Sequence, residues 1–150
     1  GLAGAVWPGR FEVVSVQPLI ILDGAQNYAS AQALKQALAE NFSRRRIILV
    51  LGISKDKDIK GVCRALVPIS SEVILTQADN PRAASVDIIH AHFPPVPDKQ
   101  TAGYRVSKAR KVRDAIILAK KKVSPDGLIL VAGSLFVVGE ARKMLLDTRC

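Results

Sequence analysis

The sequence has little of what marks several common classes of protein. Two cysteines in 150 residues, Cys63 and Cys150, are too few for a disulfide framework. No apolar run approaches the roughly 20 residues that span a bilayer, and the N-terminus lacks the basic-then-apolar pattern of a signal peptide. These absences favour a cytoplasmic location and exclude a membrane partner.

Familiar catalytic and metal-binding motifs are also missing. There is no G-x-x-x-x-G-K-[ST] phosphate loop and no G-x-G-x-x-G dinucleotide fingerprint. His90 and His92 have no accompanying cluster of Cys, His and acidic residues, so we predict no metal site in this chain. No nucleophile–base pair stands at a recognisable spacing, so no catalytic residue is assigned.

Acidic residues are scarce in one segment, and this explains the formal charge of +9. Residues 99–122 hold nine of the 22 basic residues and one acid, Asp114, whereas charges elsewhere are nearly balanced. A basic chain invites a nucleic-acid interpretation. Aromatic residues make up only 5% of the chain and offer few stacking surfaces. We therefore interpret residues 99–122 as a solvated face, and keep a basic nucleic-acid-binding module as the alternative.

What the sequence does contain indicates one folded domain. Apolar residues make up 49% of a chain whose length suits a single domain. It begins with Gly1-Leu2, and its one methionine is Met144, so we expect a processed or excised part of a longer protein.

Short β-rich runs alternate with helical patterns along the chain. We expect strands over residues 11–16, 19–22, 47–51, 73–75, 104–106 and 128–132. We expect helices over residues 28–42, 58–66, 85–91, 108–123 and roughly 136–146. This alternation predicts an α/β fold, a three-layer Rossmann-like domain with a mostly parallel β-sheet flanked by helices.

Polar or glycine-containing segments follow four of the expected strands, at the edge where such sheets bind ligands. They are residues 23–27, 52–58, 76–83 and 133–134. Asp23 could accept bonds from ribose hydroxyls or serve only as a turn residue, and Asn27 is placed to cap a helix. We interpret residues 55–58 mainly as a solvated loop and a helix start.

Three further polar residues have both a ligand-binding and a structural interpretation. Arg10 follows Pro8-Gly9 and could meet a phosphate or an aromatic base, or be solvated. Arg82, in Asp79-Asn80-Pro81-Arg82, could grip a carboxylate or belong to an Asx-type turn. Ser134 could meet an anion or cap the last helix.

Taken together, five segments resemble, in order, the C-terminal domain of folylpolyglutamate synthase/dihydrofolate synthase, within the Mur ligase superfamily. They are WPGRFEVV (7–14), ILDGAQN (21–27), ILVLGISKDKD (48–58), VILTQADNPRA (73–83) and DGLILVAGSLFVVGEAR (126–142). The resemblance implies a Mur ligase C-terminal domain over residues 10–150. It makes residues 1–9 the end of an interdomain linker or central-domain remnant, and implies an upstream P-loop ATPase domain absent from this chain.

The resemblance also implies a reaction. The family phosphorylates a substrate carboxylate with ATP, and the amine of an incoming amino acid attacks the acyl phosphate to give an amide, ADP and phosphate. By resemblance, Arg10, Asp23, Gln26 and Ser134 contact ATP, and Asn80 and Arg82 contact the amino acid, which we take to be L-glutamate. Gln26 departs from the family's D-G-A-H-N, and unlike His it cannot become charged near neutral pH.

The implied partners are ATP, Mg²⁺, L-glutamate, folate or dihydropteroate, and the protein's own ATPase domain, which would carry most metal ligands. A monomer is expected, and the isolated domain is expected to be inactive. A muropeptide ligase C-terminal domain is the enzyme alternative, although W-P-G-R and G-S-L-F-V-V-G-E-A-R favour the folate branch.

Overall fold

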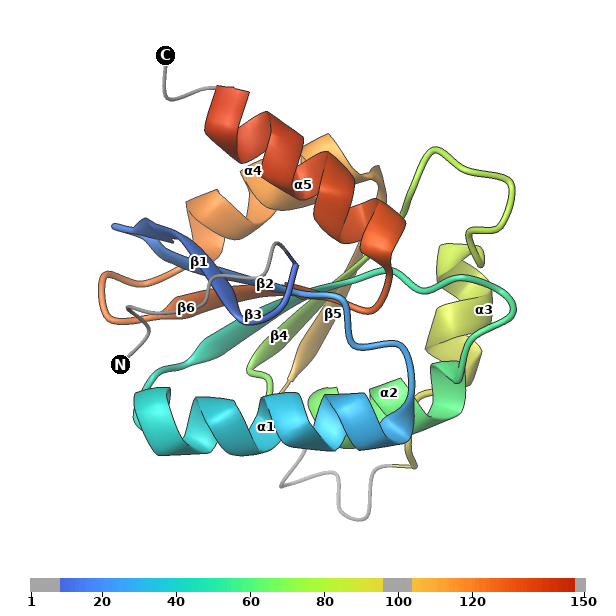
Figure 1. The fold of residues 1–150 in the computed structure, drawn as a ribbon, viewed down its shortest axis with the longest axis horizontal. Helices are drawn as coiled ribbons and strands as arrows, with labels where there is room; N and C mark the ends of the chain where they lie inside the picture. Colours follow the sequence, from blue (N-terminus) through green and yellow to red (C-terminus); the bar gives the residue numbers. More distant parts are fainter. Residues whose placement is uncertain (1–8, 96–103, 148–150) are drawn as a thin grey trace.

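A six-stranded sheet lies between two layers of helices (Figure 1). The structure is a computed structural model that describes residues 9–95 and 104–147. The strands follow the order β1-β2-β6-β3-β4-β5, in which β1 is antiparallel to β2 and every other neighbouring pair is parallel. The strands are β1 (Glu12–Val16), β2 (Leu19–Asp23), β3 (Ile47–Leu51), β4 (Glu72–Gln77), β5 (Arg105–Lys111) and β6 (Leu128–Ala132). The expected mostly parallel sheet is confirmed.

The helices divide between the two faces of the sheet. They are α1 (Tyr28–Phe42), α2 (Ile59–Leu66), α3 (Val86–Ala91), α4 (Val112–Lys122) and α5 (Leu135–Asp147). Helices α1, α2 and α3 pack into one hydrophobic cluster, and α4 and α5 pack into the other. In β2, Leu19 and Ile21 join the first cluster whereas Ile20 joins the second, as the alternation of side chains along a strand requires. The three-layer expectation is therefore confirmed.

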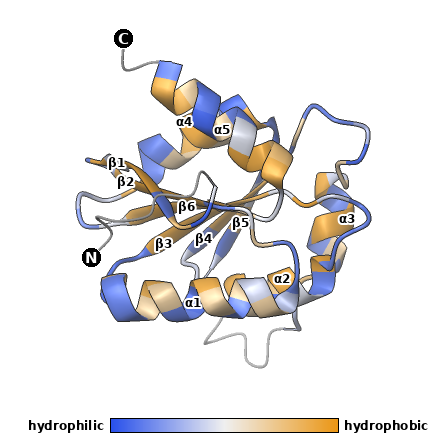
Figure 2. Cartoon of the chain, in the orientation of Figure 1, coloured by the Kyte–Doolittle hydropathy of each residue, from blue (hydrophilic) through white to orange (hydrophobic). Residues whose placement is uncertain are grey.

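Burial on both faces explains the apolar runs of the central strands. Every residue of β3 and of β6 is buried, and Figure 2 shows the middle of the sheet as hydrophobic. Both strands span the residues expected from their uninterrupted apolar runs. The outer helices carry hydrophilic residues among their hydrophobic ones, because only one side of each meets the sheet (Figure 2).

The helix expected over residues 108–123 and the strand expected over residues 104–106 differ most from their expectations, whereas other boundaries shift by one or two residues. The helix expected over residues 108–123 begins at Val112, and residues 108–111 instead extend β5. Ala109 packs against the same cluster as Val112 and Ile116. It therefore joins the apolar face that the sequence predicts, but it does so from strand β5 rather than from the helix. Pairing with β4 decides the conformation: Lys108 lies opposite Leu75, and Lys111 lies opposite Gln77. Such non-local pairing leaves no local signal in the sequence.

Among the residues that the structure describes, no helix has the length and apolar character needed to cross a membrane. Several sequence expectations concern residues 1–8, 96–103 and 148–150, which lie outside the described part of the chain. They include part of the expected linker, Lys99 in the basic segment, and Cys150.

Candidate functional site

The loops that follow four parallel strands meet at the carboxyl edge of the sheet. The Asp58 amide donates to the Gln26 carbonyl over 3.1 Å, joining the loop after β2 to the loop after β3. The Lys55 amide donates to the Arg82 carbonyl over 2.7 Å, joining the loops after β3 and β4. The Gly52 amide donates to Ala132 at the end of β6 over 3.3 Å. The polar segments thus gather at one edge, as the sequence predicts.

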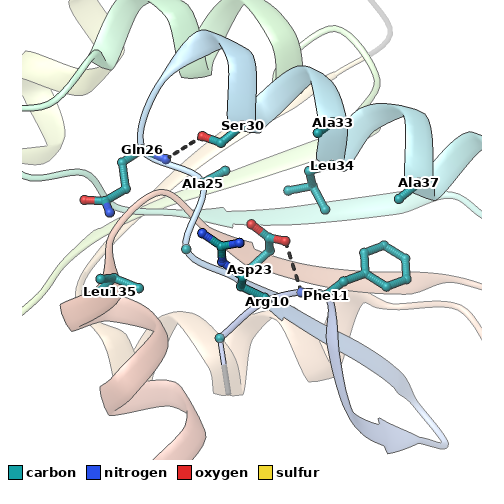
Figure 3. Close-up of a pocket in the computed structure, with 12 residues that line it drawn as sticks. Arg10, Phe11, Asp23, Ala25, Gln26, Ser30, Ala33, Leu34, Ala37 and Leu135 are labelled. Atoms are coloured by element: carbon teal, nitrogen blue, oxygen red, sulfur yellow. Dashed lines mark hydrogen bonds between the residues drawn. The ribbon is translucent and has the colours of Figure 1, made fainter. Parts of the chain in front are cut away.

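A pocket of about 570 Å³ opens at this edge, between the start of β1, the end of β2 and one side of α1 (Figure 3). Three of the four residues that the sequence suggests for ATP line it: Arg10, Asp23 and Gln26. The remainder of the lining is largely apolar and includes Phe11, Leu34 and Leu135. A pocket with a few convergent polar groups on an apolar wall is typical of a small-ligand site.

Arg10 stands on a turn whose backbone is unusual on both sides. Gly9 has φ of 78°, and Phe11 has φ of 44°, a left-handed conformation that is costly for a residue with a side chain. Hydrogen bonds hold the turn: the Gly24 amide donates to the Gly9 carbonyl over 2.7 Å, and the Phe11 amide donates to Asp23 Oδ2 over 3.0 Å. The turn therefore fixes the backbone of Arg10 beside Asp23.

Asp23 ends β2 as a half-buried carboxylate. Burial raises its pKa above the ordinary value of 3.8, because the charged form loses hydration. Hydrogen bonds from the Phe11 and Ala25 amides and the nearby charge of Arg10 act in the opposite direction but do not cancel the effect of burial on this pKa. Asp23 thus presents a carboxylate with incomplete compensation for its lost water, which suits it to accept bonds from a ligand.

Gln26 lies at the entrance to α1, and its backbone is held in place by the helix cap. Asn27 caps the helix as the sequence predicts, with Oδ1 accepting from the Ser30 amide over 2.8 Å, and the Gln26 amide donates to Ser30 Oγ over 3.2 Å. The Tyr28 amide donates to Asp58 Oδ2 over 3.0 Å. Two of the first three helix amides are therefore already engaged, so an anion here would depend mainly on side chains.

Ser134 is placed differently from the other suggested ATP contacts. Only 2% of the residue is exposed, and its hydroxyl accepts from the Phe136 and Val137 amides over 3.1 and 3.4 Å. Its helix-capping interpretation is confirmed, and it does not line the pocket. The next residue, Leu135, does line the pocket.

The two residues suggested for the amino acid lie in the loop after β4. Asn80 Oδ1 accepts from the Arg82 amide over 2.9 Å, which is the Asx-type turn that the sequence suggested. The Arg82 guanidinium donates to Asp56 Oδ2 over 2.5 Å and lies 5.9 Å from the centre of the Phe136 ring. This pairing with Arg82 lowers the pKa of Asp56. The structure thus pairs the Arg82 guanidinium with an exposed carboxylate, and a carboxylate of a ligand could take the place of Asp56.

Sequence reasoning missed two residues of this edge and part of the role of a third. Asp56 looked like a loop charge, but it pairs with Arg82. Asp58 caps α2 through Gly61, as the predicted helix start implies, and it also accepts from the Tyr28 amide at the start of α1, which the sequence did not indicate. Leu135 is 58% exposed although it is large and apolar. Its position directly after Gly133-Ser134, at a helix start, was the available signal.

No group of three or more His, Cys, Asp or Glu residues within 9–95 and 104–147 is arranged to hold a metal ion. Cys63 is a core residue, and burial raises the pKa of its thiol to about 12. Cys63 does not line the pocket.

Comparison with known proteins places this geometry in a family. The family model described as Mur ligase, glutamate ligase domain, matches residues 9–135. The chain is 38% identical over 142 residues to a probable bifunctional folylpolyglutamate synthase/dihydropteroate synthase of Halobacterium salinarum, covering 95% of this chain and 17% of that protein.

Solved structures agree in fold. Mycobacterium tuberculosis folylpolyglutamate synthase complexed with ADP is 32% identical, with a TM-score of 0.82 over 95% of this chain and 33% of its own. A bifunctional folylpolyglutamate synthase/dihydrofolate synthase with Mn, AMPPNP and L-glutamate bound is 30% identical, with a TM-score of 0.81 over 95% of this chain and 32% of its own. The chain thus spans a third or less of the length of these relatives. It belongs to the Mur ligase family, as a glutamate ligase domain.

Proposed function

We propose that this chain is the C-terminal domain of an ATP-dependent ligase that adds L-glutamate to folate, and that it supplies contacts to ATP and to the incoming amino acid. The observation that carries the proposal is the meeting of Arg10, Asp23 and Gln26 in one pocket at the carboxyl edge of the sheet. Relatives at 32–38% identity bear folylpolyglutamate synthase names, and one was solved with ADP.

In this proposal the pocket holds the nucleotide. The Asp23 carboxylate accepts bonds from ribose hydroxyls, the Arg10 guanidinium donates to the nucleotide, and the uncharged Gln26 amide makes a dipolar contact with a phosphate. Ser134 contributes through the shape of the α5 start rather than by its hydroxyl, which is already engaged.

The chemistry proceeds in two steps. A folate carboxylate oxygen attacks the γ-phosphorus of ATP, and ADP leaves; the amine of glutamate then attacks the acyl carbon, and phosphate leaves as the amide forms. Such phosphoryl transfer depends on positioning and charge neutralisation. Mg²⁺ fits no cluster of the described residues, so we expect its ligands elsewhere in the enzyme.

Arg82 is the proposed contact for a carboxylate of glutamate. A guanidinium can bind a carboxylate in a bidentate manner. The ion pair with Asp56 shows that the Arg82 side chain can bind a carboxylate at this edge of the sheet. One relative was solved with L-glutamate bound. Asn80 supports Arg82 by fixing its backbone.

The remainder of the catalytic machinery is proposed to lie in another part of the enzyme. The solved relatives are about three times as long as the region that this chain matches. We expect a P-loop ATPase domain upstream in the gene, and we expect the isolated chain to bind ATP weakly without catalysing ligation. The muropeptide alternative is not favoured, because the relatives named above are folate enzymes.

Nucleotide binding is the direct test. We expect saturable ATP binding to this chain, followed by nuclear magnetic resonance titration, and a loss of about tenfold or more in affinity for Asp23→Ala, because charge-assisted bonds are lost. The matched control is Asp126→Ala, which changes an exposed aspartate in the turn before β6. Equal ATP affinity in both variants would contradict the proposed role of Asp23.

Amino-acid binding is tested in the intact enzyme. We expect Arg82→Ala to raise the KM for glutamate about tenfold or more, because a charge-assisted contact is lost. Asp56→Asn should instead lower that KM by at most about fivefold, since an exposed ion pair competes only weakly. An unchanged KM and kcat for glutamate in Arg82→Ala would exclude the contact.

A further inference from the structure

A buried carboxylate lies directly behind the pocket, at the first residue of β1. Glu12 is only 6% exposed, although it stands beside a turn at the surface. A carboxylate is costly to bury unless it is paired and hydrogen-bonded. Its partners therefore indicate what it does.

Glu12 binds two segments that are far apart in the sequence. Its Oε1 accepts from the Gly9 amide over 3.0 Å. Its two oxygens also accept from Arg142 Nε on α5, over 3.2 and 3.1 Å. The arginine neutralises the buried charge, so the remaining bond to Gly9 can be maintained inside the protein.

The Gly9 bond completes a set of tethers around Arg10. Glu12 and Gly24 hold the amide and carbonyl of Gly9, and Asp23 holds the amide of Phe11. The residues on both sides of Arg10 are in the left-handed region, where a backbone stays only if its surroundings hold it. Arg10 itself is exposed at the surface of the protein. Its direction into the pocket depends on these tethers (Figure 3).

We propose that Glu12 is a positioning residue that aims Arg10 at the nucleotide, with Arg142 as its counter-ion. The inference rests on the proposed function, since it concerns the same pocket. Arg142 also ties the turn to α5, whose first residue, Leu135, lines the pocket. The two sides of the pocket are thus joined through one ion pair, in which Glu12 is buried and Arg142 is partly exposed.

The test is a set of ATP titrations on the full chain, read by nuclear magnetic resonance. We expect Arg10→Ala and Glu12→Ala each to weaken ATP binding about tenfold, the loss of one charge-assisted contact. Because Glu12 acts through Arg10, the double variant should bind ATP no more weakly than Arg10→Ala alone. Glu40→Ala, which removes an exposed glutamate of α1, should bind like the wild type.

Glu12→Ala leaves Arg142 without its partner and could therefore fail to fold. Two double variants, in which Arg142 is also replaced, cover that case. Glu12→Gln with Arg142→Met removes both charges but keeps an oxygen that accepts from Gly9, and should bind ATP within about twofold of wild type. Glu12→Met with Arg142→Met also removes both charges but lacks that acceptor, and should weaken binding about tenfold.

The outcomes separate this inference from the proposed function. Additive losses in Glu12→Ala and Arg10→Ala, or equal ATP affinity of the two Arg142→Met pairs, would overturn the role of Glu12. The proposed function would then stand, provided that Asp23→Ala still loses ATP. No saturable ATP binding by the wild type would overturn the proposed function and this inference with it.

Discussion

At the scale of single residues, the proposed binding role of Asp23 comes with a cost in stability. Its carboxylate loses hydration in the folded protein, and the Phe11 amide and Arg10 only partly compensate, so its pKa is raised from 3.8. Between 3.8 and the raised value, the folded state binds more protons than the unfolded state. Asp23 therefore makes its most favourable contribution to the free energy of unfolding below pH 3.8, and this contribution is lost as the pH rises through the raised pKa of the folded state.

We expect Asp23→Asn to raise the free energy of unfolding at pH 7, because the amide has no charge to desolvate and its oxygen can still accept from Phe11. The difference should vanish well below pH 3.8, where Asp23 is protonated in both states. Urea denaturation at both pH values measures this, with Asp126→Asn as the exposed control. A less stable Asp23→Asn protein at pH 7 would show that the bonds to the carboxylate outweigh its desolvation.

At the scale of elements, the connection from β6 to α5 places Leu135 at the pocket and Phe136 beside Arg82. Gly133 has φ of 109°, and a Cβ on it would lie 2.3 Å from the Gly52 carbonyl oxygen. The close approach of the loops after β6 and β3 therefore requires glycine here.

We expect Gly133→Ala to lower the free energy of unfolding by about 2–4 kcal/mol, because it combines an unfavourable backbone conformation with a backbone clash. Gly139→Ala is the matched control within α5, where a Cβ meets nothing within 4 Å. It should stabilise the protein by about 0.5–1 kcal/mol, since alanine favours helix. Urea denaturation compares the two, and equal effects would refute the steric argument.

At the scale of the whole molecule, most of the excess positive charge lies along β5 and α4, away from the pocket that Arg10 and Asp23 line at the other end of the sheet. Two of its lysines are paired, Lys108 with Asp87 and Lys122 with Glu72. Buried Val112, Ile116 and Ala119 hold the other side of α4 against the sheet. This arrangement agrees with a solvated face.

We expect this face to bind nucleic acid only through nonspecific charge attraction. Affinity for any duplex should fall steeply between about 50 and 200 mM salt, with no preference for sequence. Fluorescence anisotropy with two unrelated duplexes measures this. Asp23→Ala should leave duplex binding unchanged while it weakens ATP binding. Sequence-specific binding that resists salt would instead favour the nucleic-acid-binding alternative.

The sequence by itself determined the elements whose signals are local. The uninterrupted apolar runs defined β3 and β6, and Asn27 marked the start of α1, because burial on both faces and helix capping each require particular residues in place. The order of strands and helices also predicted which loops would share one edge. The family resemblance added the residues of the pocket.

Only the tertiary structure decided the features that depend on distant partners. Residues 108–111 became strand because β4 pairs with them, and Ser134 turned inward to cap α5. Glu12 gained its role from Arg142, 130 residues away, and Arg82 met Asp56 from another loop. Local patterns record which face of an element is buried, whereas pairings between distant residues depend on how the faces are packed together.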